Sequence, residues 1–440
     1  MSGVTAGIRT AQARPVGRGR WWAFARRQVS LAAVCLFFLV AVSSDGYLGA
    51  SRIAFLVNRA AGTYGFRLAA WETQALAQKA RDLVQRPGAA LSQQVQHDLV
   101  VAHFDDIERI GNLSDEIEQI YADPSQANPS AAARPLQAEL DALRARQASR
   151  RPAVERILEQ QTASVLQEAR LSAGRHVWPP VRFQFTESPL YLIVSPRNRI
   201  AITKGVYLDP AVNVAAMETI ETQVQESLDV SALVEGTGGF SSYPTMVIEY
   251  PSLEWVASTV AHEWAHTYLA FRPLGWHYDD SGDMRTLNET VASIVGDEIG
   301  RSVMLRFYPE LVRPEAWPRP LALSPGWWGL NPEERPFEFA PFMRQTRLTV
   351  DRLLAEGRVP EAETYMEGQR KTLLDHGYTI RKLNQAYFAF HGSYAVGPGA
   401  TDPIGGKLHA LRDRATSLVE FVQTVARFTT ASALDAALDR

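Results

Sequence analysis

Cysteine is nearly absent from this chain: Cys35 is the only one among 440 residues. A single cysteine excludes an internal disulfide. Cys35 lies inside an apolar run that continues beyond it, and Val34 precedes it, so the pattern of a lipid-anchored cysteine is not met. We interpret Cys35 as an apolar filler residue.

The chain also lacks a strong excess of charge of either sign, since its formal net charge is −3. Six arginines and no acidic residue precede Asp45, so the remainder of the chain carries a net charge of −9. A mildly acidic body offers no broad basic surface, and nucleic acid is therefore not a predicted partner. No internal repeat is present, and the 46% apolar content is ample for a large core.

Long apolar runs are scarce as well. The run at residues 29–42 has 14 uncharged residues and reaches the length of a membrane span only if it extends toward residue 49. A tryptophan pair and an arginine pair precede it, as at a membrane interface. We therefore predict a cytoplasmic basic tail at 1–28 and a single-pass membrane anchor at 29–49, with the rest of the chain extracytoplasmic. The alternative is a cleavable signal peptide that is cut near residues 41–43.

The pattern of residues 50–175 predicts a helical region. Helical patterns cover four stretches, at residues 71–86, 89–110, 114–121 and 135–171, the last with a break near Pro152. The region is either a stalk or lid for a downstream domain or a set of helices packed on that domain, and composition does not separate the two. His97 and His103 lie six positions apart and off a common helical face, so they are not predicted ligands.

Residues 176–440 predict a second domain of the α+β class, mainly helical with a small mixed sheet. Short apolar stretches bounded by proline, glycine and asparagine predict strands at 181–185, 190–195, 199–208 and 243–250. Helices are predicted at 210–228, 252–271, 342–356, 360–376, 380–390 and, with breaks, 417–438. A further helix begins near residue 281, and no strand is predicted beyond residue 300.

One motif dominates this second domain: His262-Glu263-Trp264-Ala265-His266, an H-E-x-x-H pattern. Ser252 is a natural N-cap for the helix that carries it. Positions i and i+4 lie on the same face of a helix, so the two imidazoles can hold one metal ion. Glu263 lies beside them, where a carboxylate can take a proton from a zinc-bound water.

Glu289 is the predicted third ligand. It lies on the next predicted helix, which Ser281 or Asp283 caps, with 22 residues between it and His266. Small residues on roughly the same face allow two helices to approach closely: Ala292, Ser293, Gly296 and Gly300. A zinc peptidase site needs three protein ligands and one open position for water, and Glu289 completes such a set.

The pair of motifs, H-E-x-x-H followed by Asn288-Glu289, resembles that of the gluzincins, and more narrowly that of the membrane-anchored bacterial metallopeptidases of this clan. The resemblance covers residues 240–300 and implies a zincin-like catalytic domain at 176–440. It implies a Zn²⁺ site with these ligands and this general base: His262, His266, Glu289 and Glu263. Gluzincins of the thermolysin kind often carry an aspartate four residues after the glutamate. Ser293 stands there, which leaves open the group that orients a ligand histidine.

Two polar residues downstream are candidates for stabilising the charge that develops on the carbonyl oxygen. Gluzincins place a tyrosine or histidine for this purpose C-terminal to the zinc motif, so the resemblance implies Tyr394 or His391 as a catalytic residue. The alternative is a buried helix end whose hydrogen bonds are satisfied within the fold. His277, in the loop between the two metal-site helices, is a rival to Glu289, although no helix fixes its position.

These features predict an exported, membrane-anchored zinc metallopeptidase that hydrolyses peptide bonds in a peptide or protein substrate. A first alternative is an aminopeptidase, which needs an acidic group near the substrate's free amine. Glu249 is the only carboxylate in the strand predicted before the motif. A second alternative is a non-catalytic binding or scaffold protein that contains zinc. Loss of the general base would mark that class, and Glu263 is intact.

Overall fold

The computed structural model describes residues 52–123, 125–172, 176–312, 337–392 and 403–439. These residues belong to one unit, Gly46–Arg440. The predicted tail and membrane anchor, and Tyr394, lie outside the described residues. Among the described helices, none is long and apolar enough to cross a membrane.

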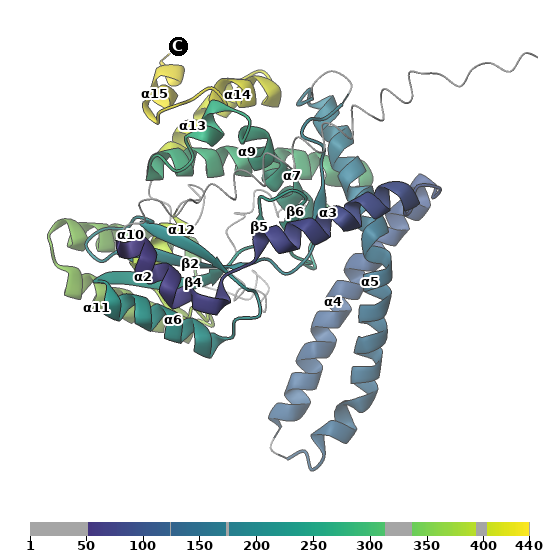
Figure 1. Ribbon diagram of the computed structural model, residues 1–440, viewed down its shortest axis with the longest axis horizontal. Coiled ribbons are helices and arrows are strands. Elements are labelled where there is room, and N and C mark those ends of the chain that lie inside the picture. The colour runs from purple at the N-terminus through teal and green to yellow at the C-terminus, as the bar shows by residue number, and fades with distance from the viewer. Residues whose placement is uncertain (1–51, 124, 173–175, 313–336, 393–402, 440) are drawn as a thin grey trace, which may run out of the picture. The chain divides into compact units, whose positions relative to one another are not determined.

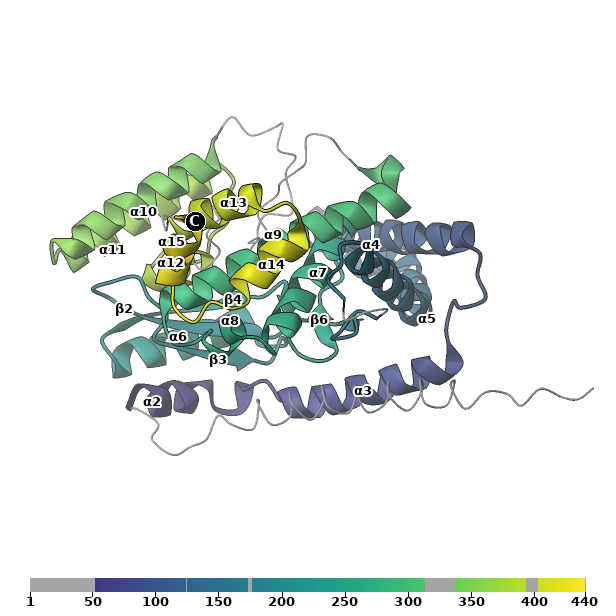
Figure 2. The same ribbon diagram turned by 90° about the horizontal axis from the view of Figure 1, so that it is seen from above.

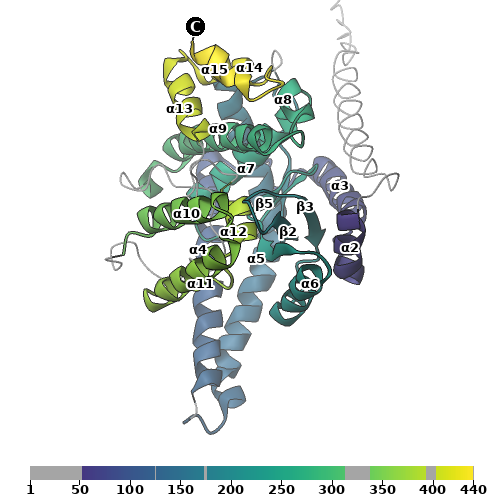
Figure 3. The same ribbon diagram turned by 90° about the vertical axis from the view of Figure 1, so that its left-hand side faces the viewer.

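A three-stranded antiparallel sheet lies between two groups of helices (Figures 1 and 3). Its strands, in the order β3-β2-β4, are Lys204–Leu208, Leu190–Pro196 and Val230–Gly236. Successive side chains alternate between faces, so Leu192 packs with one helix group and Ile193 with the other. The first group is α2 (Arg52–Ala61) and α6 (Val214–Ser227), and the second is α10 (Phe339–Ala355), α11 (Val359–Asp375) and α12 (Gln385–His391).

Strand β4 is absent from the sequence prediction. Two residues separate it from helix α6, and its alanine and leucine suit a helix as well as a strand. What makes it a strand is tertiary pairing: β4 pairs with β2 along its whole length, from Leu190 opposite Gly236 to Pro196 opposite Val230. The α+β class is confirmed, whereas the single predicted sheet is wrong, because β1 and β6 pair with β5 in a separate sheet.

This second sheet is small and mixed, with the order β1-β6-β5. Its strands are β1 (Phe183–Phe185), β6 (Thr245–Val247) and β5 (Gly239–Phe240). β1 runs parallel to β6, and β5 runs antiparallel to it, so β5 forms one edge of the sheet. The short β6 is the last strand before the helix that carries the H-E-x-x-H motif.

Helices α7 (Leu253–Leu269) and α9 (Gly282–Phe307) form the centre of the largest core, with the short α8 (Pro273–Trp276) between them. The predicted N-cap Ser252 is confirmed, because its side chain accepts from the backbone N–H of Trp255. Of the two candidates for α9, Ser281 is the cap and accepts from the N–H of Met284, whereas Asp283 lies in the first turn. Glycine lets the two helices touch. A Cβ atom on Gly296 would lie 2.8 Å from the Ser258 carbonyl oxygen and 2.9 Å from the His262 Cβ.

The helical region before the sheets consists of α3 (Leu68–Gln85), α4 (Gln93–Ala122) and α5 (Pro129–Glu168), and α4 and α5 run side by side (Figures 1 and 2). The predicted breaks in α4 and α5 are wrong. Helix α5 continues through Pro152, because the residues that follow are buried against the core and offset the lost hydrogen bond. These core residues include Val154, Ile157 and Leu158.

Packing divides this region into two halves. The inner halves of α4 and α5 share the core of α7 and α9, as Phe104 and Val165 do. The outer halves pack on each other around Leu113, Leu140 and Leu143. The inner half is thus part of the core that supports the metal-site helices.

Three short helices end the chain: α13 (Ile404–Arg414), α14 (Leu418–Val425) and α15 (Ser432–Leu438). The sequence predicts the last two as one broken helix and misses α13. Helices α13 and α14 pack on α9. In the described part of the chain beyond residue 300, every regular element is a helix, as predicted.

Candidate metal centre

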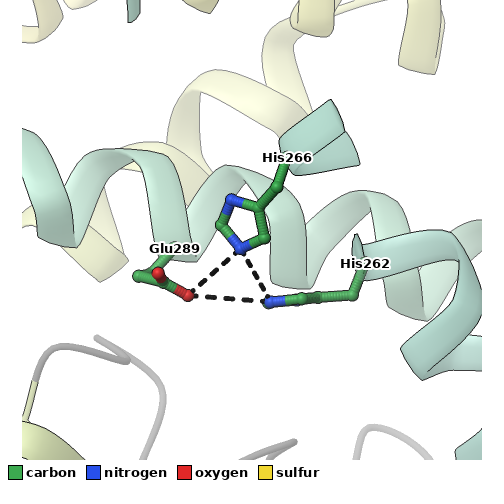
Figure 4. Close-up of side chains that lie close together, drawn as sticks. All are labelled: His262, His266 and Glu289. Carbon is green, nitrogen blue, oxygen red and sulfur yellow. Dashed lines mark hydrogen bonds and ion pairs between the residues drawn. The ribbon is translucent and has the colours of Figure 1, made fainter. Parts of the chain in front are cut away.

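His262, His266 and Glu289 come together between α7 and α9 (Figure 4). The two Nε2 atoms of the histidines lie 3.0 Å apart. The Oε2 atom of Glu289 lies 3.3 Å from Nε2 of His266 and 3.6 Å from Nε2 of His262. Three donor atoms therefore converge on one point.

These distances fit a zinc ion. Zinc binds imidazole nitrogen and carboxylate oxygen at about 2.0–2.2 Å in a tetrahedron, which separates the ligand atoms by about 3.3–3.5 Å. The Oε2 atom of Glu289 is buried, and among the described residues it has no partner with good hydrogen-bond geometry. A cation would satisfy this oxygen and both Nε2 atoms together. The donor set is typical of zinc.

Asn288 orients the second histidine. Its Oδ1 atom lies 2.8 Å from Nδ1 of His266 and can accept the proton on that nitrogen, so Nε2 is the nitrogen that could bind a metal. Ser293, where gluzincins often have aspartate, instead donates to the backbone oxygen of Glu289 at 2.9 Å. The residue beside the glutamate ligand takes the orienting role that the sequence left open.

Electrostatics couple the three side chains. Burial works to lower the pKa of His266, but the negative charge of Glu289 raises it to about 9. Burial would raise the pKa of Glu289, yet the two histidines hold it well below its usual range. Burial lowers the pKa of His262, which keeps that imidazole neutral and able to bind a metal. An ionised carboxylate therefore persists in a buried position.

Glu263 is buried on the same helix, and burial raises its pKa to about 8. Strand β5 lies directly against it: a Cβ atom on Gly239 would be 2.5 Å from Oε1 of Glu263. Only a residue without a side chain allows this contact. The carboxylate is thus held between the metal ligands and the edge strand of the small sheet.

Aromatic side chains extend from this edge strand. Phe240 packs edge-on against Tyr207, which stacks on Tyr191 with ring centroids 4.6 Å apart. Phe390, next to His391, contacts the ring of Tyr191. All four rings are partly exposed, so apolar surface is available beside Glu263.

Tyr278 is a site residue that the sequence analysis missed. Its hydroxyl donates to Oε1 of Glu289 at 2.6 Å. Tyr278 directly follows His277 in the loop, and the sequence analysis considered only the histidine there, as a potential ligand. His277 instead pairs with Asp280 through Nδ1 at 2.6 Å, and the metal cluster does not include it.

The other candidates occupy distinct places. His391 is buried at the end of α12 beside Tyr387, and burial lowers its pKa to about 3, so it is neutral. Tyr394 lies outside the described residues. Glu249 forms two hydrogen bonds with Arg151, at 2.7 and 3.0 Å, and lies 3.3 Å from Nε2 of His103. His97 lies 2.7 Å from a carboxylate oxygen of Glu310.

Comparison of the chain with protein families, curated proteins and solved structures gives no match.

Proposed function

We propose that this chain is a zinc metallopeptidase of the gluzincin type, anchored in the membrane by residues 29–49. The observation that carries the proposal is the convergence of His262, His266 and Glu289 at zinc-like separations, with Glu263 beside them. An intact carboxylate in that position supports catalysis over a structural zinc site, since a structural site has no need of a base.

The side chains divide the chemistry as follows. When bound, Zn²⁺ supplies a Lewis acid that lowers the pKa of a water molecule and polarises a carbonyl oxygen. Glu263 accepts a proton from the attacking water and returns it to the leaving amine. Asn288 holds the imidazole of His266 in the tautomer that binds a metal.

Strand β5 offers a place for the substrate backbone. It lies at the edge of its sheet and touches Glu263 through Gly239. An extended peptide that pairs with this edge would bring a carbonyl group to the base, and the rings of Phe240 and Tyr207 would contact an apolar side chain. This arrangement favours peptides with large apolar residues next to the cleaved bond.

Internal cleavage is the form of the activity that we favour. An aminopeptidase needs a carboxylate that is open to the substrate's amine, and Glu249, its one candidate from the sequence, already pairs with Arg151. A cation in that position neutralises the charge that would attract an amine.

The test is cleavage of a mixed peptide library by the detergent-solubilised full chain and its Glu263→Gln variant, both loaded with zinc. The variant keeps the size of the side chain but removes the base. It should therefore still bind one zinc, and its turnover should fall by a factor of about 10²–10⁴. Internal cuts by the wild-type chain alone support an endopeptidase. Cuts one residue from free N-termini would make it an aminopeptidase, and equal cleavage by both proteins would refute the role of Glu263.

A further inference from the structure

The two oxygen atoms of Glu289 have different surroundings. Oε2 faces the Nε2 atoms of both histidines, and Oε1 accepts the hydroxyl proton of Tyr278 at 2.6 Å. A carboxylate can bind a metal through one oxygen or through both. The hydrogen bond occupies the oxygen that would otherwise turn toward the metal.

Tyr278 is itself held in place from two sides. The guanidinium of Arg285 lies over its ring, 5.3 Å from the centroid, and the ring of His266 meets it edge-on at 6.4 Å. Arg285 is fixed in turn by Asp279 through a contact of 2.5 Å between Nη2 and Oδ1. Loop and helix residues thus form a chain of contacts that ends at one carboxylate oxygen.

We propose that Tyr278 is a positioning residue that restricts Glu289 to metal binding through Oε2 alone. This inference rests on the proposed metal site. Its consequence is chemical: a glutamate that binds through both oxygens fills one more coordination position, and a hydrolytic zinc site needs that position for water and substrate. Tyr278 therefore keeps the site open without touching the metal.

If the hydrogen bond of Tyr278 only stabilised the fold, its removal would have a different result. Tyr308 provides the comparison, because its buried hydroxyl donates to Gln161 at 2.9 Å, away from the metal cluster. Both Tyr278→Phe and Tyr308→Phe remove one buried hydroxyl and keep the ring. A structural role predicts that the two variants lose stability alike and leave the metal spectrum unchanged.

The experiment uses the full chain in detergent with Co²⁺ in place of zinc, and it measures the visible absorption of wild type, Tyr278→Phe and Tyr308→Phe. Four-coordinate Co²⁺ absorbs strongly, and added ligands weaken its bands. Wild type and Tyr308→Phe should show intense bands, and Tyr278→Phe bands that are severalfold weaker. With zinc, Tyr278→Phe should lower kcat at least tenfold and leave KM within about twofold.

The outcomes separate the two proposals. Identical spectra for all three proteins would overturn the role of Tyr278 and leave the proposed function intact. The expected spectral change in a chain that cleaves no peptide would support the role of Tyr278 and contradict the peptidase. If wild type binds no Co²⁺, both proposals fail.

Discussion

Two regions of this protein bury several ionisable groups, and they solve the electrostatic problem differently. In the first, Lys79 of α3 contacts Glu155 and Glu159 of α5 at 2.7 and 2.8 Å, and Arg182 adds a second cation to Glu159 at 2.9 Å. The same carboxylates accept the backbone N–H groups of β1. Every charge there has a partner from the chain itself.

In the second region, between α7 and α9, the groups that balance the carboxylate of Glu289 are the imidazoles of His262 and His266. Oε2 of Glu289 lies 3.3 Å from Nε2 of His266 and 3.6 Å from Nε2 of His262. The two histidines offset the burial of this carboxylate and hold its pKa well below its usual range. The groups that balance this carboxylate are themselves typical metal ligands, whereas lysine and arginine are not, so the contrast distinguishes a structural ion cluster from a candidate metal site.

Removal of Lys79 should have the largest effect on stability. Lys79→Met leaves Glu155 and Glu159 buried without their cation, so we expect a loss of about 3–5 kcal/mol in the free energy of unfolding. Urea denaturation measures it. Arg109→Met, which removes exposed ion pairs with Glu116 and Glu139, is the control and should change stability little. Equal losses in the two variants would show that the buried ion cluster stabilises the fold no more than exposed ion pairs do.

Zinc bound to His262, His266 and Glu289 should raise the free energy of unfolding by about as much as the loss of Lys79 lowers it. Saturation at about 1,000 times the dissociation constant stabilises a folded chain by about 4 kcal/mol. The midpoint of thermal unfolding should therefore rise with zinc in wild type and in Lys79→Met, if the latter folds, and stay constant in Glu289→Ala. A zinc-dependent rise in Glu289→Ala equal to that of wild type would place the ion elsewhere.

Separation of the two helices should weaken both stability and metal binding. Gly296→Ala places a Cβ atom 2.9 Å from that of His262, so we expect a loss of about 1–3 kcal/mol and weaker zinc binding. Gly368→Ala on α11, where no atom lies within 4 Å of the new Cβ, is the matched control. Calorimetry and zinc titration of both variants measure the difference, and unchanged zinc affinity in Gly296→Ala would argue against the tight contact.

Asp297 should give the smallest effect, one that depends on pH. Burial, with the charges of Glu298 and Glu254, raises its pKa to about 7. A raised folded-state pKa means that the folded chain loses stability as pH rises from about 4 to 7. Asp297→Asn should therefore stabilise by about 1 kcal/mol at pH 8 and by less at pH 5. A stabilisation that is the same at both pH values would exclude this cause.

The sequence predicted the features of this site that follow from helix geometry. The spacing of His262 and His266, the caps at Ser252 and Ser281, and the small residues facing α7 are all local patterns with a fixed meaning on a helix. Tyr278 could not be found in this way, because a loop residue reaches Glu289 only through the packing of α8. Strand β4 was missed because its state depends on its partner β2.

Zinc content after dialysis against a weak chelator tests whether Glu289 is the third zinc ligand. The comparison is between wild type, Glu289→Ala and His277→Ala, because His277 is the rival ligand and pairs with Asp280 instead. Wild type and His277→Ala should each retain one zinc per chain, and Glu289→Ala should lose it, since two histidines alone form an incomplete set. Full retention of zinc in Glu289→Ala, or its loss in His277→Ala, would show that Glu289 is not the third ligand.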